Sequence, residues 1–385
     1  MHIAIDGTPA INDIRAIQRY TDNLIMELSE IDHEDAFSII YLGYKPDISS
    51  APPKISNTNF HNVFSSIPGK LLEASWAFAS FPKGSFWTNG EADLMHFPGG
   101  YAYIPTSGEK VITTIHGFLY QKHPEFADPN KSKTVLERLE KTIKLSNHFI
   151  TVSETNKKEL EEIFSIKSSM ITAIPLGIGK EFRKYDLCRE DRVSIMRKYS
   201  LPEKDFLLYV GSIEPNKNIQ GILTAYSKLP LVNRNNFNLV LVGGKTAYLN
   251  NYVEQTRLLG IQDQVIFIDY INPASHDLAY LYNLAKLFIF PSFYEGWASP
   301  PLESMKCGTP ALVSDIPSLK ESTGGTACYC NPKDPDDISQ KIKQMLEDKA
   351  LYESFRKKGL DFTSGYTWRR CAESTLQLYK NIDAK

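Results

Sequence analysis

Apolar residues form short continuous runs that alternate with longer amphipathic segments. The runs predict buried strands at HIAIDG, FSIIYLG, LMHFP, KVITTIH, HFITVS and MITAIPLG, because unbroken apolarity over a strand length is typical of a parallel sheet covered on both faces. Apolar residues spaced three or four positions apart predict helices at about 17–28, in KTVLERLEKTIKLS and in SETNKKELEEIF. Ser153 is placed to cap the last of these helices.

The same alternation starts again after Lys204. Strands are predicted at FLLYVGS, FNLVLVGG, VIFIDY, LFIFPS, PALVSD and ACYCNP, and helices at about 218–229, 252–259 and 277–285 and after Pro301. The stretch Gly179–Lys204 is charged and interrupted, and we interpret it as a linker. The chain ends in a predicted long helix, YTWRRCAESTLQLYKNI.

Strands that alternate with helices predict an α/β protein with parallel sheets. We expect two tandem Rossmann-like, doubly wound domains, residues 1–183 and 200–365, with the helix 366–385 after them. Ligands of such sheets bind outside the carboxyl ends of the strands. The two domains are therefore expected to face a central crevice that holds the ligand.

Composition narrows the class of protein. The 385 residues are 42% hydrophobic and 23% charged, as in ordinary globular enzymes. The net charge of −2 gives no general attraction to nucleic acid. Five cysteines without a CxxC, and histidines without an HExxH, favour neither a disulfide framework nor a metal site. The first residues lack a secretory signal and no run of about 18 apolar residues occurs, so a cytoplasmic location is expected.

The most informative segment is residues 288–315, FIFPSFYEGWASPPLESMKCGTPALVSD. A strand leads into a loop with Glu295, and Pro300 and Pro301 suit the first positions of a helix because they need no backbone donor there. Glu303 is then expected in the first helical turn. The amides of Ala298 and Ser299 would point out of the helix start and favour an anion. The alternative is a helix cap beside a surface acid.

Other polar residues follow predicted strands. Lys217, in YVGSIEPNKN, could bring positive charge to a phosphate, although a lysine at a helix start is usually only solvated. His116 follows KVITTI, and Asp6 and Gly7 follow the first strand, at the ends where active-site residues gather. A structural histidine and a simple turn remain the alternatives. The apolar segment 71–87, near Lys70 and Lys83, would suit a membrane surface, an acceptor lipid, or a partly buried helix and loop.

The segment PSFYEGWASPPLESMKCGTPALVSD strongly resembles the signature of retaining glycosyltransferase family 4, in which two glutamates are separated by seven residues. Further stretches match in order along almost the whole chain: IDG, TIHGFLYQKHPEF, FITVSETNKKEL, IPLGI, YVGSIEPNKN, LVLVGG and YTWRRCAESTLQLYK. The resemblance implies the two-domain glycosyltransferase-B fold, with the last helix crossing back onto the N-terminal domain. The IEPxKN form is similar to bacterial mannosyl- and rhamnosyltransferases of surface polysaccharides.

The resemblance also implies roles for residues. Glu295 would hold donor-sugar hydroxyls near the reacting centre, and His116 would meet the sugar from the other domain. Glu303 would accept from the ribose, and Lys217 would bind the diphosphate. The resemblance assigns the remaining donor contacts to Ser212, Asn216, Tyr270, Ile271, Trp297, Ala298 and Ser299, and the acceptor side to Asp6, Gly7, Ala16 and Gln18.

The implied activity is metal-independent transfer of a hexose from a nucleotide sugar, with no cofactor, to a glycan or lipid-linked acceptor. GDP-mannose is the first guess for the donor, with UDP- and dTDP-sugars as alternatives. A peripheral contact with the inner face of a membrane is left open.

Several positions depart from the family pattern. Ala16 and Gln18 stand where glycines are usual, Asn216 replaces a basic residue, and Ala298 replaces a glycine. These departures keep a second hypothesis open, a non-catalytic family member that binds nucleotide or glycan or supports a partner transferase. A phosphorylase or epimerase on the same fold is not favoured.

Overall fold

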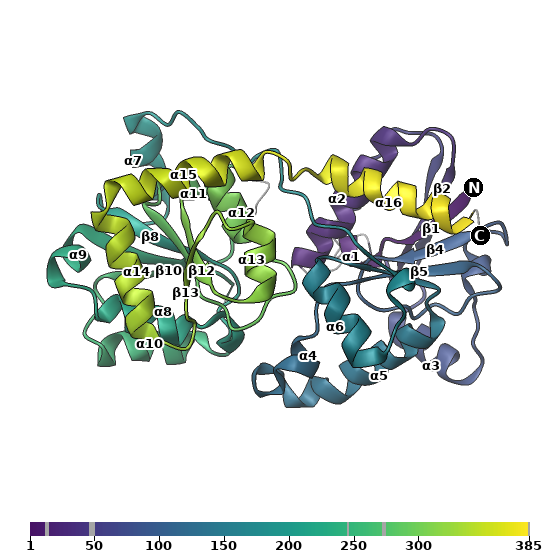
Figure 1. Cartoon of the computed structure of the whole chain (residues 1–385). Coiled ribbons are helices and arrows are strands. Elements are labelled where there is room, and N and C mark those ends of the chain that lie inside the picture. The colour runs from purple at the N-terminus through teal and green to yellow at the C-terminus, as the bar shows by residue number, and fades with distance from the viewer. Residues whose placement is uncertain (12–14, 46–50, 245, 272–274, 384–385) are drawn as a thin grey trace. The chain divides into compact units, whose positions relative to one another are not determined.

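The structure is a computed structural model that describes residues 1–11, 15–45, 51–244, 246–271 and 275–383. The chain divides into two compact units (Figure 1). The first comprises Met1–Gly177 together with Thr367–Lys385, and the second is Ile178–Tyr366. Each unit is built on its own parallel sheet.

The first unit contains a seven-stranded sheet in the order β3-β2-β1-β4-β5-β6-β7, with all neighbouring strands parallel. Its strands are β1 (His2–Asp6), β2 (Ala36–Leu42), β3 (Phe60–Ser65), β4 (Leu94–Phe97), β5 (Lys110–Ile115), β6 (His148–Thr151) and β7 (Ile171–Ala173). The strand order reverses between β1 and β4, and ligands bind at such switch points in doubly wound sheets.

Helices cover this sheet: α1 (Thr8–Ile11), α2 (Arg15–Ile31), α3 (Gly69–Phe78), α4 (Leu119–Lys122), α5 (Pro129–Leu145), α6 (Glu154–Phe164) and α16 (Trp368–Asp383). Ser153 caps α6 by accepting a hydrogen bond from the Asn156 amide at 3.0 Å, as predicted. The final helix, α16, packs against α2 (Figure 1). Its apolar face contributes Trp368 and Tyr379 to the core of the first unit.

The second unit repeats this plan with six strands in the order β10-β9-β8-β11-β12-β13. The strands are β8 (Asp205–Val210), β9 (Phe237–Val242), β10 (Val265–Ile268), β11 (Leu287–Phe290), β12 (Ala311–Ser314) and β13 (Cys328–Cys330). The helices are α7 (Arg189–Lys198), α8 (Ile219–Ser227), α9 (Leu231–Asn236), α10 (Leu249–Leu258), α11 (Asp277–Leu284), α12 (Ser299–Lys306), α13 (Pro317–Thr323), α14 (Pro335–Glu347) and α15 (Lys349–Thr363). The switch point lies between β8 and β11.

Two sequence interpretations need correction. The presumed linker Gly179–Lys204 contains helix α7, and Ile195 and Met196 of that helix lie in the core of the second unit. The many charged residues of this stretch obscured the few apolar residues that pack into the core. Strand β3 was not predicted, because only half of its sequence FHNVFS is apolar and the strand lies at the edge of the sheet. In the described ranges, no helix is both long and apolar enough to cross a membrane.

Candidate functional site

Two loops meet at the switch point of the second sheet. The first follows β8 and contains a 3-10 turn, Pro215–Lys217, and the second follows β11 and leads into α12. β8 and β11 are parallel neighbours, so their carboxyl ends lie together. The Phe293 amide donates to the Asn216 carbonyl at 2.9 Å and joins the loops directly. Predicted residues from both loops are thereby placed at one edge of the sheet.

Lys217 and Glu295 form an ion pair at this edge. Lys217 Nζ donates to Glu295 Oε1 at 2.7 Å, and the side chains are only 18% and 8% exposed. Nζ also lies 5.7 Å from the centroid of the Phe290 ring, so the ammonium rests partly over an apolar floor. Charge-assisted hydrogen bonds between partly buried groups are stronger than those at an open surface. The pair is thus a polar centre held in a largely dry setting.

Asn218 anchors the loops around this pair, although the sequence interpretation did not assign it to the site. Its backbone is left-handed, with φ of 59°, and its Oδ1 accepts from the Gly221 amide at 3.1 Å. Its Nδ2 donates to the carbonyls of Pro291 at 3.0 Å and Pro332 at 2.7 Å. An asparagine just before a helix is a recognisable N-cap signal. Its two hydrogen bonds to residues distant in the chain could not be predicted from the local sequence.

Helix α12 starts one residue earlier than the sequence suggested. It begins at Ser299, so the two prolines occupy its second and third positions and remove two of the first four backbone donors. The donors at the very start come from Ala298 and Ser299, the residues predicted to bind a phosphate. The early start also moves Glu303 out of the first turn, where it was expected.

The far end of α12 follows the sequence prediction. Gly308 has φ of 87°, and its amide donates to the Met305 carbonyl at 3.0 Å, while the Thr309 amide donates to Ser304 at 3.0 Å. These two bonds form a Schellman motif, which ends the helix sharply. The turn returns the chain directly into β12.

Glu303 is buried within the second unit. Its Oε2 accepts a hydrogen bond from the Tyr282 hydroxyl of α11 at 3.0 Å, and only 1% of the residue is exposed. Tyr282 was not identified from the sequence, because a tyrosine on an apolar helix carries no distinguishing local signal. The role of Glu303 toward a ribose stays a prediction.

The other predicted donor residues fall into two groups. Ser212 donates to Glu214 at 2.8 Å within the β8 loop, and Trp297 packs against Tyr366 with ring centroids 5.7 Å apart. The Trp297 Nε1 atom is buried and has no hydrogen-bond partner, so its N–H group is available to donate to a ligand. Tyr270 and Ile271 follow β10, which is two strands away from β8 in the sheet. They are therefore farther from the Lys217–Glu295 pair than the loop residues are.

In the first unit, Asp6 is the last residue of β1 and Gly7 follows it. Asp6 accepts from the Tyr103 hydroxyl at 2.6 Å and from the Thr8 amide at 3.1 Å, while burial raises the pKa of its carboxyl. Gly7 allows the turn to lie against Tyr41, because a Cβ there would approach the Tyr41 ring to 2.6 Å. Asp6 is a buried carboxylate with satisfied oxygens.

His116 directly follows β5, which lies on the far side of β4 from β1. Its Nε2–H donates to the Pro98 carbonyl at the end of β4, at 2.7 Å, and its ring lies edge-on to Tyr20 at 5.2 Å. Burial lowers the pKa of His116, which favours the neutral imidazole. The Pro98 bond keeps the proton on Nε2 and leaves Nδ1 as the acceptor.

The remaining predicted acceptor residues, Ala16 and Gln18, lie on α2. Ala16 is exposed, and Gln18 Nε2 donates to the Ala10 carbonyl at 3.0 Å, which ties α2 to α1. Gln18 thus has a structural role at the position where a glycine was expected. Residue Ile14, at the start of the same stretch, lies outside the described residues.

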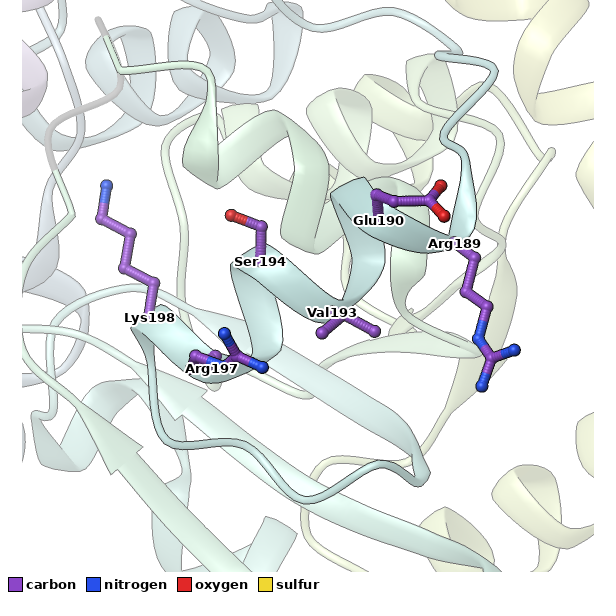
Figure 2. Close-up of a pocket in the computed structure, with 6 residues that line it drawn as sticks. All are labelled: Arg189, Glu190, Val193, Ser194, Arg197 and Lys198. Atoms are coloured by element: carbon purple, nitrogen blue, oxygen red, sulfur yellow. The ribbon is translucent and has the colours of Figure 1, made fainter.

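Figure 2 shows a surface depression of about 580 Å³ lined by Arg189, Glu190, Val193, Ser194, Arg197 and Lys198. All six residues belong to α7, and none is a predicted site residue. Within the described part of the chain, no group of three or more histidine, cysteine, aspartate or glutamate residues is arranged to hold a metal ion.

Comparison with known proteins identifies the chain. Residues 17–182 match the family model described as Glycosyltransferase Family 4, and residues 191–362 match the one described as Glycosyl transferases group 1. The chain belongs to glycosyltransferase family 4. The first match covers most of the first unit and ends at residue 182, just inside the second unit, whereas the second match lies wholly in the second unit, so both halves of this glycosyltransferase match a glycosyltransferase model.

Relatives of this glycosyltransferase include the O-antigen chain mannosyltransferase B of Escherichia coli, which is 29% identical over 99% of this chain and 100% of its own length. The serotype-specific mannosyltransferase WbdA of Escherichia coli is 32% identical over 71% of this chain but only 34% of its own length. Among solved structures, sucrose-phosphate synthase from Thermosynechococcus elongatus superposes with a TM-score of 0.75 at 18% identity, covering 100% of this chain and 99% of the other. That likeness shows the glycosyltransferase-B fold, as predicted.

Proposed function

We propose that the chain is a retaining mannosyltransferase that uses a nucleotide sugar, GDP-mannose first among the candidates, and builds a surface polysaccharide on a glycan or lipid-linked acceptor. The Lys217–Glu295 ion pair beside the start of α12 carries this proposal. The names of both Escherichia coli relatives, each a mannosyltransferase, support the choice of sugar.

The pair offers a way to bind a donor that carries both phosphates and hydroxyls. A diphosphate would replace Glu295 as the partner of Lys217, with the amides of Ala298 and Ser299 on the far phosphate. Glu295, 2.7 Å from Nζ before the exchange, would then be released to accept hydrogen bonds from sugar hydroxyls. Binding of the donor and release of Glu295 from Lys217 would therefore occur together.

Transfer would proceed on one face of the sugar. The bond between the anomeric carbon and the diphosphate oxygen breaks, and its electron pair stays on that oxygen. The acceptor hydroxyl bonds to the same face and gives its proton to the departing phosphate, so the anomeric configuration is retained. Lys217 and the helix start stabilise the growing negative charge. This charge compensation by the chain itself is the reason for proposing that no metal is required.

The test combines binding with product analysis. Melting temperatures are measured with GDP-mannose, UDP- and dTDP-sugars, with magnesium or with chelator, and transfer from the donor that binds is followed by NMR of the anomeric proton. We expect a shift and transfer with GDP-mannose, unchanged by chelator, and an α-linked product from the α-linked donor. An inverted product, or a strict need for magnesium, would contradict the mechanism.

Variants assign the effect to the site. Glu295→Gln should lower kcat about a hundredfold or more, and Lys217→Ala should weaken diphosphate binding as well as kcat. Lys228→Ala is the matched control, since Lys228 also pairs with a carboxylate, Asp336 at 2.7 Å, but at the surface. Nucleotide binding without transfer from any donor would instead favour the non-catalytic alternative.

A further inference from the structure

Large apolar side chains are exposed together on and after helix α3 of the first unit. Phe78 is 93% exposed and Leu71 is 62% exposed. Phe81 and Phe86, in the following loop, are also exposed. Single exposed apolar residues are normal on a protein surface, but a contiguous group marks an interaction site. We call Leu71, Ala74, Phe78, Phe81 and Phe86 the α3 patch.

Helix α3 is apolar on two opposite faces. Leu72 and Trp76, four residues apart, pack into a core cluster with Met95 and Phe97. Leu71, Ala74 and Phe78 are spaced by three and four residues and form the outward stripe. A helix that covers a single core needs only one apolar face. The outward stripe therefore has no partner within the described part of the unit.

The loop that completes the α3 patch is held in place. The Ser75 hydroxyl donates to the Phe81 carbonyl, and Trp76 Nε1 donates to the Pro82 carbonyl at 2.8 Å. The Phe81 and Phe86 ring centroids lie 6.1 Å apart. These bonds present the aromatic rings on a preformed surface, which lowers the entropic cost of docking.

The charges around the patch are positive. Lys70, directly before Leu71, and Lys83, between Phe81 and Phe86, are both exposed. Glu73 is the one acidic residue of the segment 66–87, and it is paired with Arg138 of α5 at 2.8 Å. Figure 1 shows α3 at the periphery of the first unit, near α5. Exposed aromatic and leucine side chains with a basic rim fit the interface of an anionic bilayer.

We propose that the α3 patch docks the protein onto an anionic lipid surface, with the apolar side chains in the headgroup region and Lys70 and Lys83 on the phosphates. A second copy of the chain fits less well, because a twofold contact through the same patch would bring the lysines of both copies together. This inference goes beyond the proposed function, since it concerns where the protein binds rather than what it transfers.

Vesicle sedimentation tests the proposal without any donor sugar, so its failure is separate from failure of the proposed transfer. The full chain is mixed with vesicles of phosphatidylglycerol and phosphatidylethanolamine, or of phosphatidylcholine alone. We expect binding to the anionic vesicles that weakens with added salt. Absence of binding to anionic vesicles would overturn the proposal.

Matched variants locate the binding. Phe78→Ser with Phe81→Ser should reduce partitioning at least about tenfold, whereas Leu258→Ser, at a residue of the second unit that is 81% exposed, should not change it. Lys70→Glu with Lys83→Glu should abolish the preference for anionic lipid, and Lys349→Glu with Lys357→Glu serves as its control. Circular dichroism confirms folding of each variant. Unaltered binding of the patch variants, or a dimer that these variants dissociate without any effect on vesicles, would overturn the proposal.

Discussion

Lys217 and Glu295 are 78 residues apart in the chain, yet Nζ of one lies 2.7 Å from Oε1 of the other. The two residues follow strands that are neighbours in the sheet and flank its switch point. The parallel pairing of β8 with β11 therefore creates the pair. The carboxylate is more buried than the ammonium. Removal of the lysine therefore leaves a buried, unpaired carboxylate, which costs more free energy than leaving the ammonium unpaired.

The first prediction concerns this pair and stability. Lys217→Met should lower the free energy of unfolding by about 2–3 kcal/mol, because it leaves Glu295 buried and unpaired. The double variant Lys217→Met with Glu295→Gln should lose less than Lys217→Met alone. Urea unfolding measures the free energies, and Lys228→Met, in an exposed pair, should change stability by less than about 1 kcal/mol. Additive effects of the two substitutions would contradict a coupled pair.

The second prediction concerns Asn218. Asn218→Ala should destabilise the second unit by about 2–4 kcal/mol, because it removes a helix cap, two side-chain bonds and a residue that tolerates positive φ. Asn218→Asp keeps the cap acceptor but turns a carboxylate toward two carbonyls, so it should be at least as damaging. Thermal unfolding compares both with Asn250→Ala, at an exposed position of α10. A mild Asn218→Asp variant would show that the cap alone matters.

The third prediction concerns the final helix. The Tyr379 hydroxyl and His96 Nδ1 share a hydrogen bond of 2.6 Å, and His96 Nε2 forms a second hydrogen bond with the Thr114 hydroxyl at 2.8 Å. Tyr379→Phe leaves Nδ1 without a partner in the core and should cost about 1–3 kcal/mol. Tyr248→Phe, at a tyrosine that is 41% exposed, should be neutral. Equal melting temperatures for the two variants would deny the buried bond any stabilising role.

His96 also sets a pH dependence. Burial lowers the pKa of His96 to about 3, so the folded state stays neutral while the unfolded state takes up a proton below about 6.5. Stability is therefore fully present above that pH and falls as the pH drops from 6.5 toward 3. The ionisation of Asp22 changes stability with pH in the opposite direction.

The fourth prediction concerns Asp22 of α2. Burial raises the pKa of Asp22 to about 7, and its buried Oδ1 has no hydrogen-bond partner. The unfolded state ionises near pH 4 and the folded state near pH 7, so stability falls as the pH rises between them. Relative to wild type, Asp22→Asn should gain on the order of 1 kcal/mol between pH 5 and pH 8, allowing for solvent screening at this partly exposed site. Denaturant unfolding at both pH values gives the difference, and a gain that is the same at both would contradict the shifted pKa.

Much of the architecture could be predicted locally. Strands such as LFIFPS and FNLVLVGG are short apolar runs between polar turns, and the structure confirms them as β11 and β9. The edge strand β3, which mixes polar and apolar residues, and the highly charged helix α7 escaped prediction, because neither has a clear apolar periodicity. Element boundaries were also approximate, as the one-residue shift at α12 shows.

The candidate site divides in the same way. The residue types and their place after strands indicated Lys217 and Glu295 in the second unit and His116 in the first as candidates, because side chains at the carboxyl ends of the strands of a parallel sheet gather at one edge of that sheet. The hydrogen-bond partners of the site residues could not be predicted from the sequence. The bonds of Asn218 to Pro291 and Pro332, of Tyr282 to Glu303 and of His116 to Pro98 join distant segments.

The sequence by itself determined which segments are apolar enough to form two parallel sheets, and which polar residues end their strands. Only the tertiary structure decided that the lysine after β8 pairs with the glutamate after β11, and that Tyr379 of the last helix forms a hydrogen bond with His96 of β4. The physical reason is that local pattern determines periodicity and capping over a few residues, whereas strand order and side-chain partners depend on packing between segments far apart in the chain.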